Sequence, residues 1–276
     1  MSPALEVQFW GTRGSLPSPG PTTARYGGNT SCVEVRAGDH RLIFDAGTGI
    51  RELGRQILGQ PRAPVHLFFS HYHWDHIMGF PFFIPIFVPG MNVQIYGESK
   101  NGQSVLEILS GQMHPPYFPI KWDMVKADVT GHALVPGAVV TLGDVVVRAT
   151  RLNHPQGSLC YRVEHQGRAV VYATDVEHGS TMDADFVQFI AGADLLVMDC
   201  SYTEQDYPGH EGWGHATWEA AARFAQEGKV PQLAIFHHLP ERTDPEVDVI
   251  QRDAQKVMPG AFAAAEGMTL SWEPRP

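Results

Sequence analysis

Three imidazoles and one carboxylate lie close together in the stretch Ser70-His71-Tyr72-His73-Trp74-Asp75-His76. This stretch directly follows the apolar run 65–69, which is typical of a buried strand. Because side chains alternate along a strand, His71 and His73 project to the same side. The next two ligand-type residues, Asp75 and His76, fall in the following turn and can reach a second ion a few ångströms away. The motif HxHxDH therefore predicts two adjacent divalent metal ions at a strand end.

The composition of the chain is that of an ordinary globular protein, and its charge is strongly acidic. Of the 276 residues, 43% are hydrophobic and 18% are charged, and the formal net charge is −10. Binding along a phosphate backbone depends on clustered Lys and Arg, and no run of four basic residues occurs. A long nucleic acid is therefore not the expected substrate.

Two features of the sequence predict a cytoplasmic protein without a membrane anchor. The N-terminus lacks a basic segment followed by an apolar one, so no secretory signal is visible. The most apolar stretch, residues 77–88, is too short to cross a bilayer and contains prolines, which favours a buried loop or a short helix. The cysteines, Cys32, Cys160 and Cys200, are isolated, and we expect buried thiols in place of a disulfide framework.

Short β-rich runs alternate with helical patterns along the whole chain, without repeats or a low-complexity linker. The pattern predicts one α/β domain over residues 1–276, with two mixed sheets between helical layers. The predicted strands cover residues 6–10, 32–36, 41–44, 65–69, 93–96, 145–152, 169–173, 195–198 and 233–236. The predicted helices cover residues 49–58, 104–110, 183–190, 217–227 and 245–257. Segment 97–128 is the least periodic, and its prolines are compatible with a structured lid or with a plain surface connection.

Other predicted strands also end in residues that can bind metals. These residues are His154, Asp175, and the adjacent pair His237 and His238. A single histidine in such a position is more often a structural hydrogen-bonding group than a ligand. Strand ends and their loops form the active edge of sandwiches of this kind, so their presence together with HxHxDH favours ligands.

The order of these residues resembles that of the metallo-β-lactamase-fold hydrolases over nearly the full length of the chain. In that family HxHxDH is followed by a lone His, a lone Asp and a C-terminal His after a strand. The resemblance implies a four-layer αββα sandwich that holds two divalent ions, Zn²⁺ or alternatively Mn²⁺ or Fe²⁺, with a hydroxide between them. The implied ligands are His71, His73 and His154 for one ion and Asp75, His76 and His237 for the other, with Asp175 bridging. His238 competes with His237, which we favour because the ligand in similar proteins comes directly after the strand.

Two further segments resemble the tRNase Z and PhnP-like phosphodiesterase branch of this family. Residues 213–221 (WGHATWEAA) are similar to a "GHST…AA" segment, and residues 9–17 with 26–31 are similar to the N-terminal hairpin. The resemblance implies that His215 stabilises the phosphorane and protonates the leaving oxygen, and it makes His215 and Asp75 the candidate catalytic residues. Local packing at a helix start is the alternative for His215. No segment matches the long Gly/Pro-rich arm of tRNase Z.

Two residues have interpretations that the sequence leaves open. Asp45 ends another strand and either supports the metal ligands from behind or caps the helix that begins near Gly49. Arg13 either faces a phosphate or braces its own loop.

The leading hypothesis is a dinuclear metal-dependent phosphodiesterase that acts on a small substrate, such as a cyclic nucleotide or a cyclic phosphate, because paired ions neutralise phosphate oxygens. The alternatives are a tRNase Z-like RNA-processing endonuclease and a carboxyl-ester or lactone hydrolase. A non-enzymatic, metal-stabilised binding protein is a weaker alternative. Inactive relatives usually lose some of the metal ligands, and this chain has a ligand-type residue at every predicted position. A homodimer is expected by analogy with dimeric relatives.

Overall fold

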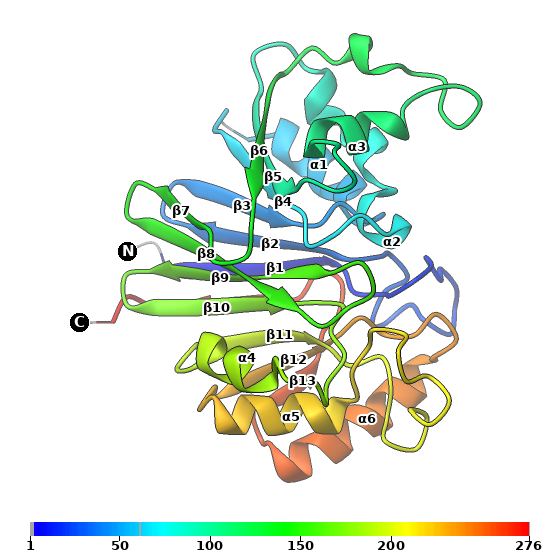
Figure 1. The fold of residues 1–276 in the computed structure, drawn as a ribbon, viewed down its shortest axis with the longest axis vertical. Helices are drawn as coiled ribbons and strands as arrows, with labels where there is room; N and C mark the ends of the chain where they lie inside the picture. Colours follow the sequence, from blue (N-terminus) through cyan, green and yellow to red (C-terminus); the bar gives the residue numbers. More distant parts are fainter. Residues whose placement is uncertain (1–2, 61, 276) are drawn as a thin grey trace.

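Two seven-stranded sheets face each other, and helices cover the outer surface of each sheet (Figure 1). This architecture is seen in a computed structural model that describes residues 3–60 and 62–275. It confirms the predicted four-layer αββα sandwich. No helix in the described part of the chain is long and apolar enough to cross a membrane.

The first sheet comes mainly from the N-terminal half of the chain and has the strand order β14-β1-β2-β3-β4-β5-β6. Its strands are β1 (Leu5–Gly11), β2 (Cys32–Ala37), β3 (His40–Phe44), β4 (Val65–Phe68), β5 (Asn92–Glu98), β6 (Asp128–Leu134) and β14 (Thr269–Trp272). The helices of this half are α1 (Ile50–Leu58), α2 (Trp74–Ile77) and α3 (Val105–Gly111), with 3₁₀ turns at Phe80–Phe82, Ile84–Phe87 and Trp122–Met124. Strands β3 to β6 run parallel.

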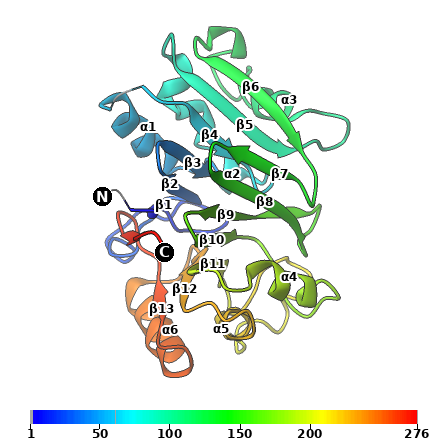
Figure 2. The ribbon, with the colours of Figure 1, turned by 90° about the vertical axis from the view of Figure 1, so that its left-hand side faces the viewer.

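The second sheet has the order β13-β12-β11-β10-β9-β8-β7 (Figure 2). Its strands are β7 (Val139–Leu142), β8 (Val145–Leu152), β9 (Ser158–His165), β10 (Arg168–Ala173), β11 (Leu195–Asp199), β12 (Gln232–Phe236) and β13 (Ala261–Ala263). Helices α4 (Asp183–Ile190), α5 (Trp218–Glu227) and α6 (Asp244–Val257) cover its outer face. Strands β10 to β13 run parallel.

The two sheets pack together through aromatic side chains from both. Phe44 on β3 stacks on Phe68 of β4, with ring centroids 5.4 Å apart, and it also lies 5.5 Å from Tyr172 of the second sheet. Strands β4 and β11 are buried along their whole length, and so are the last five residues of β10. This is expected for parallel strands that are covered on both faces. This core fixes the parallel strands, and therefore fixes where their carboxyl ends lie.

All nine predicted strands and all five predicted helices are present, with ends that differ by two residues or fewer. Strands β6, β7, β9, β13 and β14 were not predicted from the sequence. Residues 77–88 form two of the 3₁₀ turns with Phe80, Phe83 and Ile86 buried, as expected for a buried segment. Segment 97–128 contains α3 and the third 3₁₀ turn. All three cysteines are buried and unpaired.

Candidate metal centre

The predicted ligands converge at one edge of the sandwich, at the carboxyl ends of the parallel strands and beside α2 (Figure 1). The first motif follows β4 and runs into α2, where Asp75 and His76 occupy its first turn. Asp175 follows β10, and His237 directly follows β12. The loop after β8 adds His154. Parallel strands end at the same edge of a sheet, so residues far apart in sequence meet here.

Three of the residues that follow strands have left-handed backbone conformations. The φ angles are 61° at Asp45, 54° at Asp175 and 61° at His237. Such angles are uncommon for residues other than glycine, and they concentrate at functional sites where the surrounding structure enforces them. At all three positions the side chain is buried, with Asp175 and His237 in the ligand groups and Asp45 directly behind His76.

The ligand-type side chains form three overlapping groups, and Asp175 belongs to all of them. The groups are His71, His73, His154 and Asp175; Asp75, His76, Asp175 and His237; and Asp175, Asp199, His215 and His237. Within each group the potential ligand atoms lie within 4.8 Å of one another. The first two groups have the same membership as the two ligand sets that the family resemblance implies.

The two carboxylate oxygens of Asp175 face different groups. Oδ1 lies 3.1 Å from Nε2 of His76 and 3.1 Å from Nε2 of His237. Oδ2 lies 3.5 Å from Nε2 of His71 and 3.8 Å from Nε2 of His154. A carboxylate in this position can serve two ions at once, which is what a bridging ligand requires.

Two buried ring nitrogens at the centre lack hydrogen-bond partners. Nε2 of His71 and Nε2 of His76 are inaccessible to solvent, and neither makes a hydrogen bond. An unsatisfied buried polar atom is costly, and both atoms point at carboxylates. Burial, together with the neighbouring imidazole of His76, holds the pKa of His71 well below its usual range, so the His71 imidazole is neutral, as a metal ligand must be. The donor set of imidazoles and carboxylates therefore fits divalent ions such as Zn²⁺.

Hydrogen bonds from behind orient the imidazoles of the HxHxDH motif. Nδ1 of His76 lies 2.8 Å from Oδ2 of Asp45, and Nδ1 of His71 lies 3.0 Å from the hydroxyl of Ser70. The Ser70 hydroxyl in turn donates to Asp45 at 2.7 Å. With Nδ1 as the donor in both rings, Nε2 is free to bind an ion. Asp45 also accepts a hydrogen bond from the hydroxyl of Tyr172 at 2.8 Å.

These contacts decide between the two interpretations of Asp45. The helix α1 has Gly49 as its N-cap and no side-chain cap, so the capping alternative is wrong. Asp45 supports His76 directly and His71 through Ser70, as the other interpretation predicted.

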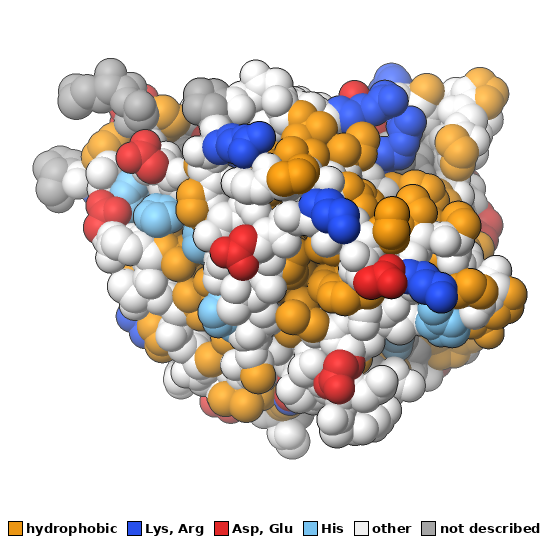
Figure 3. All heavy atoms as spheres, turned by 90° about the horizontal axis from the view of Figure 1, so that it is seen from above, with side chains coloured by type: hydrophobic (Ala, Val, Ile, Leu, Met, Phe, Trp, Pro, Cys, Tyr) orange, Lys and Arg blue, Asp and Glu red, His pale blue; other side chains and the backbone are white. Residues whose placement is uncertain are grey.

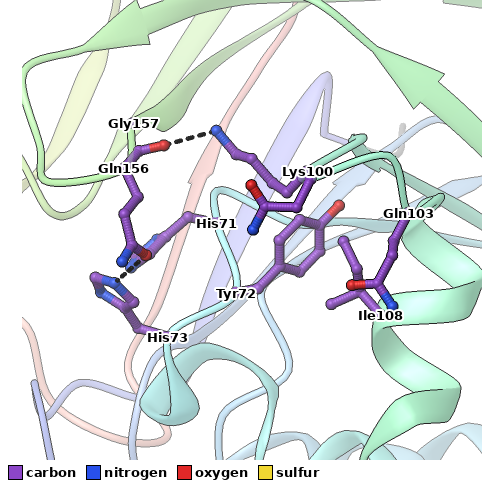
Figure 4. A pocket seen from close by; sticks show the side chains of 9 residues that line it. His71, Tyr72, His73, Lys100, Gln103, Ile108, Gln156 and Gly157 are labelled. Carbon is purple, nitrogen blue, oxygen red and sulfur yellow. Dashed lines mark hydrogen bonds between the residues drawn. The ribbon is translucent and has the colours of Figure 1, made fainter.

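The remaining imidazoles are held in the same manner. Nδ1 of His154 lies 2.8 Å from the carbonyl oxygen of Gly214, and Nδ1 of His237 lies 3.1 Å from the hydroxyl of Ser201. His73 is reversed: its Nδ1 faces Nε2 of His154 at 3.2 Å, and its Nε2 lies 3.3 Å from Oε1 of Gln156 (Figure 4). In each of these five imidazoles, one ring nitrogen contacts a group outside the centre, and the other ring nitrogen therefore faces the centre.

His215 lies beside the metal groups and pairs with an aspartate that the sequence analysis did not single out. Its Nδ1 is 2.7 Å from Oδ2 of Asp199, and its ring stacks on His237 at 5.1 Å. Burial opposes protonation of His215, but the charge and the hydrogen bond of Asp199 raise its pKa to about 9. His215 is thus held against the metal groups by a buried aspartate, which favours the catalytic interpretation over local packing at a helix start. The available signal for Asp199 was its place at the end of the buried strand β11.

Two other predicted candidates lie outside the three groups. Nε2 of His238 is 2.9 Å from the carbonyl oxygen of Ala264, so its ring points away from the centre. Arg13 is fully buried and donates to the carbonyl oxygens of Gly27, Leu239 and Arg242, so it braces loops and does not face a phosphate.

Gly214 offers a test of how strictly the first metal group is positioned. Its φ is 89°, and a β-carbon there would lie 2.3 Å from Nδ1 of His154. We expect Gly214→Ala to displace His154 and to weaken metal binding at that group by roughly tenfold or more. The matched control is Gly212→Ala, which imposes a similar backbone strain at φ 84° but meets no atom within 4 Å. Metal content after dialysis measures both, and an equal loss in the two variants would contradict the role of the contact.

A polar cavity of about 490 Å³ opens directly beside His71 and His73 (Figure 4). Side chains from several segments line it, with Lys100, Asn101 and Gln103 on one side and Gln156 on the other. The ammonium group of Lys100 pairs with Glu98 and donates to the carbonyl oxygen of Gln156 at 2.7 Å. The cavity places polar groups and one cation next to the candidate ions.

Comparisons with known proteins find a matching family model and relatives with similar sequences and structures. The family model described as "Beta-lactamase superfamily domain" matches residues 40–238. Ribonuclease Z of Thermoplasma acidophilum is 23% identical over 93% of this chain and 92% of its own length. The metallo-beta-lactamase fold protein YhfI from Bacillus subtilis has a similar structure, with a TM-score of 0.70, 22% identity, and coverage of 98% of this chain and 99% of that one. A diphosphatase from the PhnP family has a TM-score of 0.68 at 16% identity, with 98% of both chains covered.

Proposed function

This chain belongs to the β-lactamase superfamily domain family and is a metal-dependent hydrolase of the phosphodiesterase type, and we propose that it cleaves phosphodiester bonds of RNA. The observation that carries the proposal is the pair of His/Asp groups joined by Asp175, with the His215–Asp199 pair beside them. Relatives that align over more than nine-tenths of this chain are named Ribonuclease Z, which supports RNA. RNA was the alternative in the sequence analysis, and the leading expectation was a small phosphodiester.

The residues of the site have separate tasks in this proposal. His71, His73, His154 and Asp175 would hold one ion, and Asp75, His76, His237 and Asp175 would hold the other. When bound, such ions activate water and neutralise the charge on phosphate oxygens. The hydrogen bonds of Asp45, Ser70, Ser201 and the Gly214 carbonyl fix the ring orientations before any substrate arrives.

His215 supplies the proton for the leaving group. Because its Nδ1 is bonded to Asp199, Nε2 is the atom that can donate to a departing oxygen. The raised pKa of His215 keeps that proton in place near neutral pH. Asp199 is a positioning residue that orients the ring and favours its charged form.

A small phosphodiester, such as a cyclic nucleotide, is the second candidate substrate. The net charge of −10 opposes long polyanions, and the polar cavity beside His71 has a volume suited to a single nucleotide. Both substrates require the same chemistry, so the two candidates differ only in what lies beyond the scissile phosphate.

A paired substrate panel tests the proposal. Protein loaded with Zn²⁺ or Mn²⁺ would be assayed on a 3′-extended tRNA precursor, on cyclic nucleotides and on p-nitrophenyl acetate, with EDTA-treated protein as the control. We expect metal-dependent cleavage of the RNA. Turnover of cyclic nucleotides alone would favour the second candidate, and turnover of the carboxyl ester alone would overturn the phosphodiesterase assignment.

A further inference from the structure

An aromatic groove adjoins the candidate metal centre and has no assigned role. It is a cavity of about 550 Å³ formed by α2, α3 and the segments after each, and its walls include Trp74, Ile108, Phe82, Tyr117 and Phe118. Trp74 and Tyr117 are 77% and 78% exposed, which is unusual for side chains of this size. Hydrophobic side chains gather on the face of the molecule seen in Figure 3.

The groove lies next to the polar cavity at the metal centre. Ile108 of α3 lines both cavities, and Trp74 stands in the HxHxDH motif between His73 and Asp75. A molecule whose phosphate lies at the ions can therefore place its polar groups in the first cavity, which Lys100 lines, and a flat apolar group in the second. No charged side chain lines the aromatic groove within the described residues.

We propose that this groove binds the nucleobase next to the scissile phosphate by stacking, chiefly on Trp74 and Tyr117. A nucleotide carries groups that suit both cavities. Its charged phosphate and polar sugar suit the polar cavity, and its flat, uncharged base suits the aromatic groove. Stacking on aromatic side chains is the usual means of holding unpaired bases, and it needs few cations. The inference rests on the proposed phosphodiesterase function and adds that the substrate carries a base in an unpaired state.

The shape of the groove favours a base over a second copy of this chain. A two-fold dimer places the same patch of each copy against the other. Two concave grooves placed face to face would leave their hollows unfilled, whereas a planar base can enter one groove.

A pair of substrates that differ in the base tests the proposal. The metal-loaded protein would be assayed on the p-nitrophenyl ester of uridine 5′-phosphate and on methyl p-nitrophenyl phosphate, which lacks a base. Trp74→Ala should raise KM for the uridine substrate roughly tenfold, should leave its kcat within about twofold, and should leave KM for the methyl substrate unchanged. Trp74→Phe should restore most of the loss, and Leu58→Ala, an exposed apolar residue of α1 outside the groove, should have no effect.

Two further measurements keep the test decisive. Because Trp74 is next to candidate ligands, Tyr117→Ala provides the same comparison from a separate segment, and metal content is measured for both variants. If neither phosphodiester is hydrolysed, the proposed phosphodiesterase function is wrong. The groove is then tested by binding alone, and we expect AMP to bind more tightly than ribose 5-phosphate. Equal KM changes on both substrates, or conversion of a dimer to a monomer without any KM change for the uridine substrate, would overturn the proposal.

Discussion

Replacing Asp175 with alanine is expected to empty both metal positions and to lower phosphodiester turnover by several orders of magnitude. Each of its two carboxylate oxygens faces one of the two ligand groups, so its removal takes a ligand from both metal positions. An ion contributes several kcal/mol to stabilising the charge of the transition state, and each 1.4 kcal/mol corresponds to about tenfold in rate. Elemental analysis and turnover on a common phosphodiester are the measurements.

The contrast is with variants that touch only one group. Asp75 contacts His76 and His237 at 3.1 and 3.2 Å and accepts a hydrogen bond from the Ser15 amide, all on one side of the centre. We therefore expect Asp75→Ala and His76→Ala to empty the second position while the first keeps most of its metal. Equal metal loss from all three variants would remove the bridging role from Asp175.

The fold could be predicted from the sequence because its parallel strands are continuous apolar runs. Buried strands such as β4 and β11 are recognisable without any knowledge of their neighbours. Four of the five missed strands, β6, β14, β7 and β13, are the edge strands of the two sheets. An edge strand packs on fewer neighbours, so its sequence needs fewer apolar residues, and β13 has only three residues. The fifth, β9, is interior but contains Arg162 and Glu164, which pair with each other and break its apolar pattern.

Part of the candidate site could also be predicted from the sequence, namely the residues of a local motif, and part could not, namely the tertiary contacts. His71, His73, Asp75 and His76 belong to one motif, and their nearness follows from sequence spacing alone. The outer contacts do not: the Ser201 hydroxyl and the Gly214 carbonyl meet His237 and His154 across long stretches of chain. Such contacts arise only when the strands are assembled, so no spacing rule reveals them. The aromatic groove belongs to the same class, because Trp74 and Tyr117 come from different segments.

His215→Ala is expected to keep both metals and to lose on the order of 10²–10⁴ in turnover on an unactivated phosphodiester, which is the usual contribution of a positioned general acid. Asp199 orients the imidazole for this task, and His215 belongs to neither of the two groups proposed to hold the ions. A good leaving group departs without protonation. The defect should therefore shrink markedly on bis(p-nitrophenyl) phosphate, and a ratio of rates on the two substrates measures it.

Asp199→Asn separates the proton-donating role of His215 from a purely structural one. The amide keeps a hydrogen-bond acceptor near Nδ1 but removes the charge that raises the pKa of His215 to about 9. The acid form of His215 would then be lost at a lower pH, so the alkaline limb of the kcat profile on the unactivated substrate should move to lower pH. The profile on bis(p-nitrophenyl) phosphate should not move, since that reaction needs no acid. Equal losses on both substrates in His215→Ala, or an unshifted alkaline limb in Asp199→Asn, would assign the proton to another donor and leave His215 with a packing role.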